Sequence, residues 1–280
     1  MNILITGSKG QLGNEMRVMS ESHPKHRYFF TDIEELDITD RDAVSSFVAA
    51  NGIDLIVNCA AYTNVDKAEE DEATAARINS EALSVLGSQG VRVIHISTDY
   101  VFAGNACVPY RESDPAAPNT VYGLTKYDGE KRLLAVCPEA VILRTAWLYS
   151  SFGNNFVKTM LRLGKERNEL GVVFDQIGTP TYAADLAWAV FTVIESPVWR
   201  SGIYHFTNEG VISWYDFAKA IHSFAGIENC HVFPISSEEY AYKTPRPHYS
   251  VLDKTKFKKT FGVVIPYWLD GLKRCLEKMK

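Results

Sequence analysis

Short apolar runs alternate with longer amphipathic segments along the first half of the chain. The runs are nearly continuous in apolar residues, as expected for parallel strands covered by helices on both faces; they span 2–7, 27–32, 54–60, 91–98 and 140–149. Between them we expect helices at 11–20, 40–50, 68–89 and 122–136, the second of them capped by Thr39. This alternation predicts an α/β fold built on an open, doubly wound parallel sheet.

The regular alternation of predicted strands and helices ends after residue 149. We expect strands at 171–175 and 202–208, a proline-punctuated loop at 242–250, and helices at 155–165, 181–196, 214–226 and 266–280. The apolar helix at 181–196 and the strand after it can return to the main sheet. The predicted division is a large domain of residues 1–149 plus 181–208 and a smaller α/β lobe of residues 150–180 plus 209–280.

A glycine-rich turn, "TGSKGQLG" (6–13), joins the first predicted strand to the first helix. Its G-x-x-G-x-x-G spacing is a variant of the dinucleotide fingerprint, in which glycines let the backbone approach a pyrophosphate at the helix N-terminus. The turn therefore predicts that the large domain is a Rossmann-type NAD(P)-binding domain, and the alternative is a tight turn without a ligand. The predicted cofactor contacts of this turn are Gly7, Lys9, Gly10, Gln11, Leu12 and Gly13.

The end of the second predicted strand bears on which cofactor is bound. Asp32 stands where a carboxylate binds the adenosine ribose and disfavours a 2′-phosphate. Lys9 instead favours a cofactor with a 2′-phosphate, because an ammonium can pair with that phosphate. Asp37 and Ile38 are candidates to frame the adenine. The choice between NADPH and NADH stays open at this point.

Candidate catalytic residues follow the fourth predicted strand. Thr98 and Asp99 lie at its carboxyl end, where doubly wound sheets bind ligands. Tyr122 and Lys126 lie one helical turn apart on the next helix. An adjacent ammonium lowers the pKa of a phenol from about 10 and lets it act as an acid near neutral pH. The simpler interpretations are a strand-end turn and an incidental surface pair.

Composition limits the possible classes of protein. The 280 residues are 46% hydrophobic and 22% charged with a net charge of −5, which predicts a soluble globular protein without a nucleic-acid partner. No apolar run is long enough to span a membrane, and we expect no signal peptide. The five cysteines are scattered, which predicts reduced thiols in a cytoplasmic protein; no spacing indicates a metal site.

The conjunction of these motifs resembles a known family. The glycine turn, the strand-end hydroxyl and the Tyr-x-x-x-Lys pair occur in the order seen in short-chain dehydrogenase/reductases. Across nearly the whole chain, further stretches are similar to the dTDP-4-dehydrorhamnose reductase family, an extended branch of that superfamily. These stretches are "NCAAYTNVDKAE", "STDYVF", "VYGLTKYDGEK", "RTAWLY", "NNFVKTMLRL", "DQIGTPT" and "RPHYSVLD".

The resemblance implies reduction of the C4 keto group of dTDP-4-dehydro-beta-L-rhamnose to dTDP-L-rhamnose by NADPH or NADH. Tyr122 would donate the proton, Lys126 would hold the nicotinamide ribose and lower the Tyr122 pKa, and Thr98 would hydrogen-bond the sugar oxygen with help from Asp99. The resemblance also implies further cofactor contacts at Ala60, Ala61, Tyr62 and Asn79, and substrate contacts at Tyr100, Trp147, Asn155 and Arg246.

Two matters stay open within the resemblance. Some family members are magnesium-dependent dimers that use glutamates, and Glu15 and Glu277 fall at plausible positions. Ala184 replaces a further expected glutamate, which argues against a bridging Mg²⁺ and leaves a monomer or a homodimer possible. The rival functions are another 4-keto sugar-nucleotide reductase or epimerase, and a non-catalytic NADP(H)-binding regulatory subunit, which commonly lacks part of the Tyr/Lys/Thr set.

Overall fold

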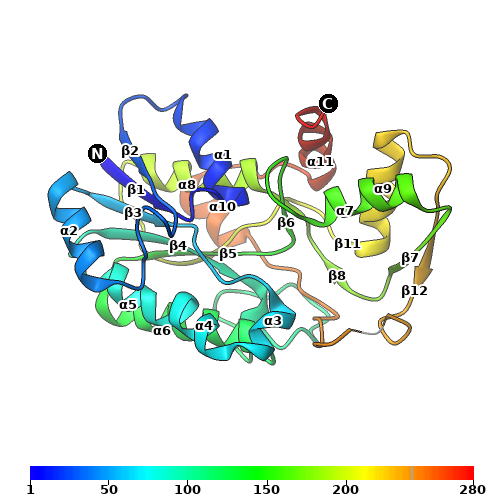
Figure 1. Cartoon of the computed structure of the whole chain (residues 1–280), viewed down its shortest axis with the longest axis horizontal. Coiled ribbons are helices and arrows are strands. Elements are labelled where there is room, and N and C mark those ends of the chain that lie inside the picture. The colour runs from blue at the N-terminus through cyan, green and yellow to red at the C-terminus, as the bar shows by residue number, and fades with distance from the viewer. Residues whose placement is uncertain (241) are drawn as a thin grey trace.

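A parallel sheet forms the centre of the larger half of the molecule (Figure 1). Within residues 1–240 and 242–280, which the computed structural model describes, six strands pair in the order β10-β5-β4-β3-β1-β2. All neighbouring strands are parallel, which confirms the predicted doubly wound sheet. The strands are β1 (Asn2–Thr6), β2 (Arg27–Phe30), β3 (Leu55–Asn58), β4 (Arg92–Thr98), β5 (Val141–Thr145) and β10 (Gly202–His205).

Helices cover both faces of this sheet because successive side chains of a strand point to opposite faces. Ile3 and Ile5 of β1 belong to one apolar core with α1 and α8, whereas Leu4 between them belongs to a second core with α2, α5 and α6. The two sets lie on opposite sides of the sheet in Figure 1. Their bounds are α1 (Gln11–Ser20), α8 (Ala183–Glu195), α2 (Arg41–Asn51), α5 (Ala82–Gly87) and α6 (Val121–Val136).

A smaller lobe lies beside the sheet, at the right of Figure 1. Its core joins three helices around the fully buried Phe217 and Leu272. Two short strand pairs complete it: β7 with β12 in parallel and β8 with β11 antiparallel. The elements are α7 (Phe156–Glu166), α9 (Trp214–Ala225), α11 (Trp268–Glu277), β7 (Glu169–Val173), β8 (Ile177–Gly178), β11 (Ile212–Ser213) and β12 (His231–Ile235).

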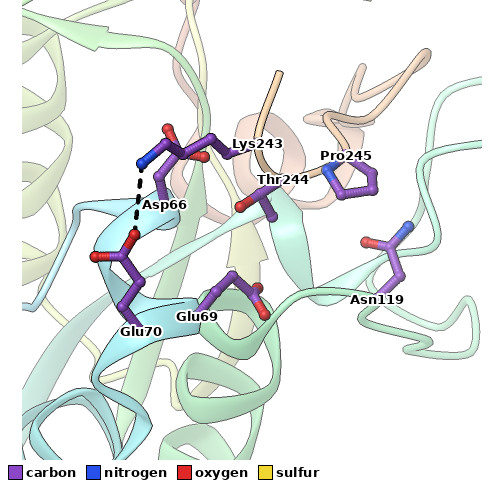
Figure 2. A pocket seen from close by; sticks show the side chains of 7 residues that line it. All are labelled: Asp66, Glu69, Glu70, Asn119, Lys243, Thr244 and Pro245. Carbon is purple, nitrogen blue, oxygen red and sulfur yellow. Dashed lines mark ion pairs between the residues drawn. The ribbon is translucent and has the colours of Figure 1, made fainter. Parts of the chain in front are cut away.

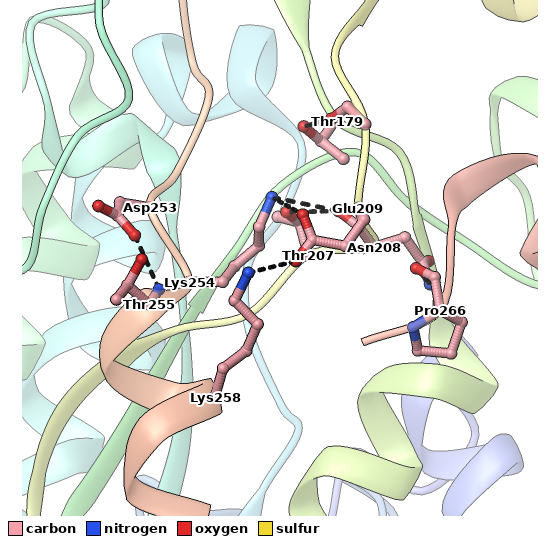
Figure 3. Close-up of polar contacts among 10 residues, drawn as sticks. Thr179, Thr207, Asn208, Glu209, Asp253, Lys254, Thr255, Lys258 and Pro266 are labelled. Atoms are coloured by element: carbon pink, nitrogen blue, oxygen red, sulfur yellow. Dashed lines mark hydrogen bonds and ion pairs between the residues drawn. The ribbon is translucent and has the colours of Figure 1, made fainter. Parts of the chain in front are cut away.

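A polar joint holds the segment that leaves β10 against the chain that leads into α11 (Figure 3). Glu209 pairs with Lys258 at 2.7 Å and with Lys254 at 3.3 Å. The backbone N–H of Glu209 donates to the Pro266 carbonyl, and its carbonyl accepts from Trp268, each at 2.9 Å. Ionic and backbone contacts therefore fix this crossing between the two halves. No helix in the described part of the chain is long and apolar enough to cross a membrane.

The predicted helix at 68–89 is wrong in its continuity. The segment forms α3 (Val65–Glu70), α4 (Glu72–Ala76), a π-helical turn η1 (Arg77–Glu81) and α5. The break falls at Asp71, which leaves the helical region and accepts from the Thr74 N–H with its side chain. The cap of α2 is likewise Asp40 and not Thr39, since Asp40 accepts from the first-turn N–H groups.

Two further differences concern the join between the halves. The predicted strand at 140–149 ends at Thr145, because Trp147 adopts a positive φ of 48° and turns the chain into β6 (Leu148–Tyr149). β6 pairs with β9 (Thr181–Tyr182), outside the main sheet. The prediction put all of 209–280 in the small lobe, but Phe257 of α10 (Thr255–Phe261) packs in the core of the large sheet.

Candidate active site

The carboxyl end of β4 forms one wall of the site. Thr98 is the last residue of the strand; its hydroxyl donates to Asp99 Oδ1 at 3.0 Å and accepts from the Tyr100 N–H at 3.2 Å. Asp99 is buried, and burial raises the pKa of its carboxyl to about 6 against the opposing hydrogen bond from Thr98. A hydroxyl and a weakly acidic carboxyl therefore lie together where the strand ends.

Helix α6 begins one residue before Tyr122 and is fixed at that end by two acceptors. The Thr120 hydroxyl accepts from the Gly123 N–H at 3.1 Å, and Glu69 accepts from the Val121 N–H at 2.8 Å. These contacts satisfy donors that the first turn of a helix leaves free. The start of α6, and with it Tyr122, is thereby held against α3.

Tyr122 lies close to the strand-end residues. Its ring packs edge-on against Tyr100 with centroids 5.3 Å apart. The side chain keeps part of its surface exposed, but burial around the hydroxyl raises the pKa of Tyr122 to about 12, which a hydrogen bond to Thr98 partly opposes. The predicted lowering of this pKa by Lys126 is therefore wrong for the protein without cofactor, because burial of the phenol dominates.

Lys126 turns inward from α6 and not toward solvent. Its Nζ lies 2.7 Å from the Ile96 carbonyl oxygen and 3.1 Å from Nε2 of His95, and the side chain is 1% exposed. Burial lowers the pKa of Lys126 to about 8. The lysine is thus a buried amine at the back of the site, one helical turn from Tyr122.

The glycine turn forms the opposite part of the site and fits a dinucleotide. Gly7 has a φ of 62°, and a Cβ there would lie 2.6 Å from the Ala60 backbone nitrogen. Gly13 packs directly against the Gly7 carbonyl. Gly10 precedes α1, and among the described residues no side chain caps this helix. Close backbone packing and free first-turn N–H groups are what a pyrophosphate at a helix N-terminus needs.

Acidic residues surround the predicted ribose position. Asp32 accepts from the Lys9 N–H at 2.9 Å, so its carboxylate lies against the glycine turn. The Lys9 ammonium contacts Glu34 and lies 3.2 Å from Glu35. The Lys9 ammonium, which favours a 2′-phosphate, is therefore paired with Glu34 and Glu35, and these two carboxylates were not among the predicted site residues.

The remaining predicted cofactor residues occupy different environments. Asn79 accepts from the Tyr62 N–H at 2.8 Å and donates to the Tyr62 carbonyl at 3.0 Å, so it holds the loop that contains Ala60 and Ala61. Ile38 is 7% exposed in the core beneath the sheet, and the Asp37 carboxylate accepts from Thr39. The adenine contact predicted for these last two residues remains a prediction.

Two predicted substrate residues lie near the junction of the halves. The Trp147 indole stacks on Trp214 with centroids 3.5 Å apart. Asn155 caps α7 by accepting from the Lys158 N–H, and its amide donates to Gln11 at 3.0 Å. Asn155 therefore links α7 to the glycine-turn helix, a role that its assignment to the substrate did not include.

Two shallow cavities of about 330 and 340 Å³ share Lys243 and Pro245 in their linings, and Arg246 lines the second. Its Nη2 donates to Asp66 of α3 at 2.8 Å, while Nη1 is buried without a hydrogen-bond partner among the described residues. Figure 2 shows the first cavity, where Lys243 pairs with Glu70. The second is lined by Gln176, Ser237, Glu238, Tyr240, Tyr242, Lys243, Pro245, Arg246 and His248.

Glu15, one of the two glutamates considered for a metal, has contacts inside the chain. Glu15 is 1% exposed, accepts from the Ser150 hydroxyl at 2.7 Å and pairs with Lys278 at 3.2 Å. Its carboxylate is thus used inside the chain, between α1 and the C-terminal helix. Within residues 1–240 and 242–280, no group of three His, Cys, Asp or Glu side chains is arranged to hold a metal ion.

Comparison with known proteins assigns the family. The family model described as the RmlD substrate binding domain matches residues 1–280. A dTDP-4-dehydrorhamnose reductase from Aggregatibacter actinomycetemcomitans is 41% identical over 97% of this chain and 97% of its own length. The chain belongs to the dTDP-4-dehydrorhamnose reductase family.

Solved structures of dTDP-4-dehydrorhamnose reductases agree with the fold described above. The enzyme from Clostridium acetobutylicum is 42% identical, with a TM-score of 0.95 over 100% of this chain and 99% of that one. The enzyme from Bacillus anthracis, solved in complex with NADP, is 39% identical, with a TM-score of 0.94 over 99% of each chain. The resemblance stated from the sequence motifs is confirmed.

Several residues of this family member's site were missed by sequence reasoning. A polar residue inside the apolar run "VRVIHIST" was the signal for His95, and the acidic pair that begins two residues after Asp32 was the signal for Glu34 and Glu35. Asp66, the partner of Arg246, had no such signal, because the two residues are 180 positions apart in the sequence.

Proposed function

We propose that the protein reduces the C4 keto group of dTDP-4-dehydro-beta-L-rhamnose to dTDP-L-rhamnose with NADPH or NADH. The observation that carries this proposal is the proximity of Tyr122 to Thr98 at the end of β4, with Lys126 bound to the Ile96 carbonyl of the same strand, in a fold whose glycine turn fits a dinucleotide. The full-length relationship to dTDP-4-dehydrorhamnose reductases supports the choice of substrate.

Tyr122 is the proton donor in this proposal. The reduced nicotinamide supplies the hydride when it is bound. Because burial raises the pKa of Tyr122 to about 12, the side chain is a phenol at neutral pH and has a proton to give to the oxygen that develops negative charge. Thr98 exchanges its hydrogen bond to Asp99 for one to that oxygen and stabilises the charge.

Lys126 orients the cofactor in this proposal. The Ile96 carbonyl and His95 occupy two of its bonding directions, and the remaining N–H is available to the hydroxyls of the nicotinamide ribose. Asn79 keeps the loop at Ala60 to Tyr62 in place against the same cofactor.

Arg246 binds the diphosphate of the substrate in this proposal. Its unpartnered Nη1 can donate to a phosphate oxygen, and Tyr240 and Tyr242 of the adjoining cavity offer aromatic faces to the nucleoside. Tyr100 and Trp147 are proposed to contact the sugar. The sugar nucleotide would thus lie between the NAD(P)-binding domain and a substrate-binding lobe, in a cytoplasmic monomer or homodimer.

The test is the oxidation of NADPH or NADH, followed by absorbance, with the 4-keto sugar nucleotide generated in situ. Tyr122→Phe should lower kcat by about 10²–10⁴-fold while cofactor binding by fluorescence persists. Tyr127→Phe, on the same helix, is the matched control and should behave as wild type. Wild-type turnover in Tyr122→Phe would remove this residue from the role of acid.

The assay also separates the alternatives. Oxidation that occurs only with a different 4-keto sugar nucleotide would indicate another reductase of this superfamily. Cofactor binding without oxidation of any such substrate would indicate a regulatory subunit. Retention of the complete Thr98, Tyr122 and Lys126 set favours the catalytic alternative.

A further inference from the structure

A buried chain of polar side chains runs beneath the site from β1 to α6. Thr6 Oγ1 donates to Asn58 Oδ1 at 2.6 Å, Asn58 Nδ2 lies 3.1 Å from His95 Nδ1, and His95 Nε2 lies 3.1 Å from Lys126 Nζ. All four side chains are at most 1% exposed. Buried donors must meet acceptors, so the position of each proton can be worked out along the chain.

The orientation of Asn58 follows from its fixed neighbours. The Ala60 backbone N–H lies 3.2 Å from Asn58 Oδ1. A backbone N–H can only donate, so the side-chain atom that faces it must be the amide oxygen. The amide nitrogen then faces His95, and because an NH₂ group donates, Nδ1 of His95 must be the acceptor.

The tautomer of His95 follows in turn. A neutral imidazole carries one proton, and with Nδ1 accepting from Asn58 that proton lies on Nε2. Nε2–H points at Lys126 Nζ, and an ammonium has no lone pair to accept it. An uncharged amine does: its lone pair accepts from His95, one N–H donates to the Ile96 carbonyl at 2.7 Å, and the other is free.

Burial favours the uncharged forms of both His95 and Lys126. Burial lowers the pKa of His95 well below its usual value, and Lys126 lowers it further. Burial also lowers the pKa of Lys126, while Glu130 on the same helix raises it. The Glu130 carboxylate is bound by Arg144 of β5 at 2.6 Å, and the groups that face His95 from β3 and β1 are an uncharged amide and hydroxyl.

We propose that His95 is a positioning residue for Lys126: Asn58 holds it as the Nε2–H tautomer, in which it donates to the lysine and favours the uncharged amine in the cofactor-free protein. The inference rests on the proposed catalytic role of Lys126. A proton that arrives on Lys126 requires Nε2 as an acceptor, and the His95 proton must then be on Nδ1, against the Asn58 amide. The charge of Lys126 is therefore tied to the orientation of Asn58, and through it to Ala60 in the cofactor loop.

The direct test is ¹⁵N NMR of histidine-labelled, cofactor-free protein at a pH somewhat above the pKa of Lys126. Two-bond ¹⁵N–¹H couplings distinguish the Nε2–H from the Nδ1–H tautomer, and the His95 signals are assigned by their loss in His95→Gln or through the backbone. We expect Nε2–H; finding Nδ1–H or a doubly protonated ring would overturn the proposal. The NMR measurement needs no substrate, so its outcome does not depend on whether the proposed reaction is correct.

A pair of variants tests the consequence for catalysis. His95→Leu removes a donor that stabilises the uncharged amine, so the basic limb of the pH profile of kcat/KM for the cofactor, which reports the groups of the cofactor-free enzyme, should move upward by about one pH unit. If His95 instead accepts from an ammonium, the same variant moves that limb downward, which would contradict the proposal. His205→Leu is the matched control, since His205 is equally buried on β10 but faces the Tyr110 carbonyl; its profile should match wild type.

A second variant reverses the direction of the hydrogen bond between residue 58 and His95 without removing the imidazole ring. Asp at position 58 can still accept from Thr6 and Ala60 but also accepts from His95, so Asn58→Asp should switch His95 to the Nδ1–H tautomer and raise the pH at which activity is lost. An unchanged tautomer in folded Asn58→Asp would show that Asn58 does not set it. If neither variant folds, the NMR reading of the wild-type protein still decides the question.

Discussion

Two buried lysines, one in the candidate active site and one in the joint between the halves, differ in how their charge is compensated. Lys254 is 7% exposed and lies 3.3 Å from Glu209; burial lowers its pKa, and Glu209 opposes this. Lys126 is 1% exposed and contacts only the Ile96 carbonyl and His95 through Nζ among the described residues. A buried lysine that is paired with a carboxylate is part of the structural framework. A buried lysine that lacks such a partner is unfavourable for folding, so we explain its presence by function.

Exchange of the two lysines for an apolar side chain should separate these roles most strongly. Lys126→Met removes the group proposed to orient the cofactor and should lower kcat by about 10²–10³-fold. Lys254→Met should leave kcat close to wild type, since this residue lies in the joint. The measurement is steady-state turnover of both variants, and comparable losses would mean that the joint also supports catalysis.

The Lys126→Met variant should lose turnover but gain stability. Burial lowers the pKa of Lys126 from 10.5 to about 8. Below that pH the folded protein carries an unfavourable buried charge, so Lys126→Met should be more stable than wild type by about 3 kcal/mol near neutral pH. Between about pH 8 and 10.5 the unfolded chain binds a proton that the folded chain lacks. Wild-type stability therefore rises relative to the variant, and the gap in urea unfolding should close over this range.

The joint should be weakened by loss of its carboxylate. Glu209→Gln leaves the buried Lys254 without a counter-charge and should lower the free energy of unfolding by about 1–2 kcal/mol, after allowance for the partial exposure of Glu209. Burial tends to raise the pKa of Glu209, but Lys258 and Lys254 together hold it below its ordinary value of 4.5.

The pH dependence of this effect has a definite sign. A depressed carboxyl pKa contributes stability above the unfolded value, and that contribution is lost as the pH falls through the folded pKa. The difference between wild type and Glu209→Gln should thus disappear in acid. The control is Glu228→Gln at an exposed position; a gap that persists below the folded pKa would contradict the ionic explanation.

Lys9 adds an exposed member to the comparison, with the smallest expected effect. Its ammonium is shared by Glu34 and Glu35, which raise the pKa of Lys9. Replacing both carboxylates by glutamine frees Lys9 for a 2′-phosphate and should raise the ratio of kcat/KM for NADPH over NADH by roughly 2–10-fold. Glu21→Gln is the surface control. An unchanged ratio would place the adenosine ribose away from this cluster.

Local pattern was sufficient for much of the fold. Helix α1 has the bounds expected from its periodicity, and the strands of the large sheet fall inside the predicted apolar runs. The sequence could not reveal the break at Asp71 or the turn at Trp147. A continuous helical pattern hides the local cap in which the Asp71 side chain accepts from the Thr74 N–H, and a positive φ at a tryptophan contradicts its local preference.

The site was predictable where chemistry follows spacing. Tyr122 and Lys126 were found because four residues make one helical turn, but the effect of Lys126 on the phenol was wrong. Nearness along the helix does not tell whether an ammonium faces its neighbour or the strand behind it. His95 and Asn58 were not identified, because their contact depends on the order of strands in the sheet.

The contact between α6 and η1 at Gly129 has a consequence for how the site can change. At Gly129 a side chain would collide with the carbonyl of Asn79, the residue that holds Tyr62. Helix α6 and the residue that holds the loop at Tyr62 are thus set at a spacing with no tolerance for even a methyl group. A larger residue at position 129 would push α6 away from η1. Tyr122 and Lys126 would then tilt together and be misaligned relative to the cofactor, although both side chains remained intact.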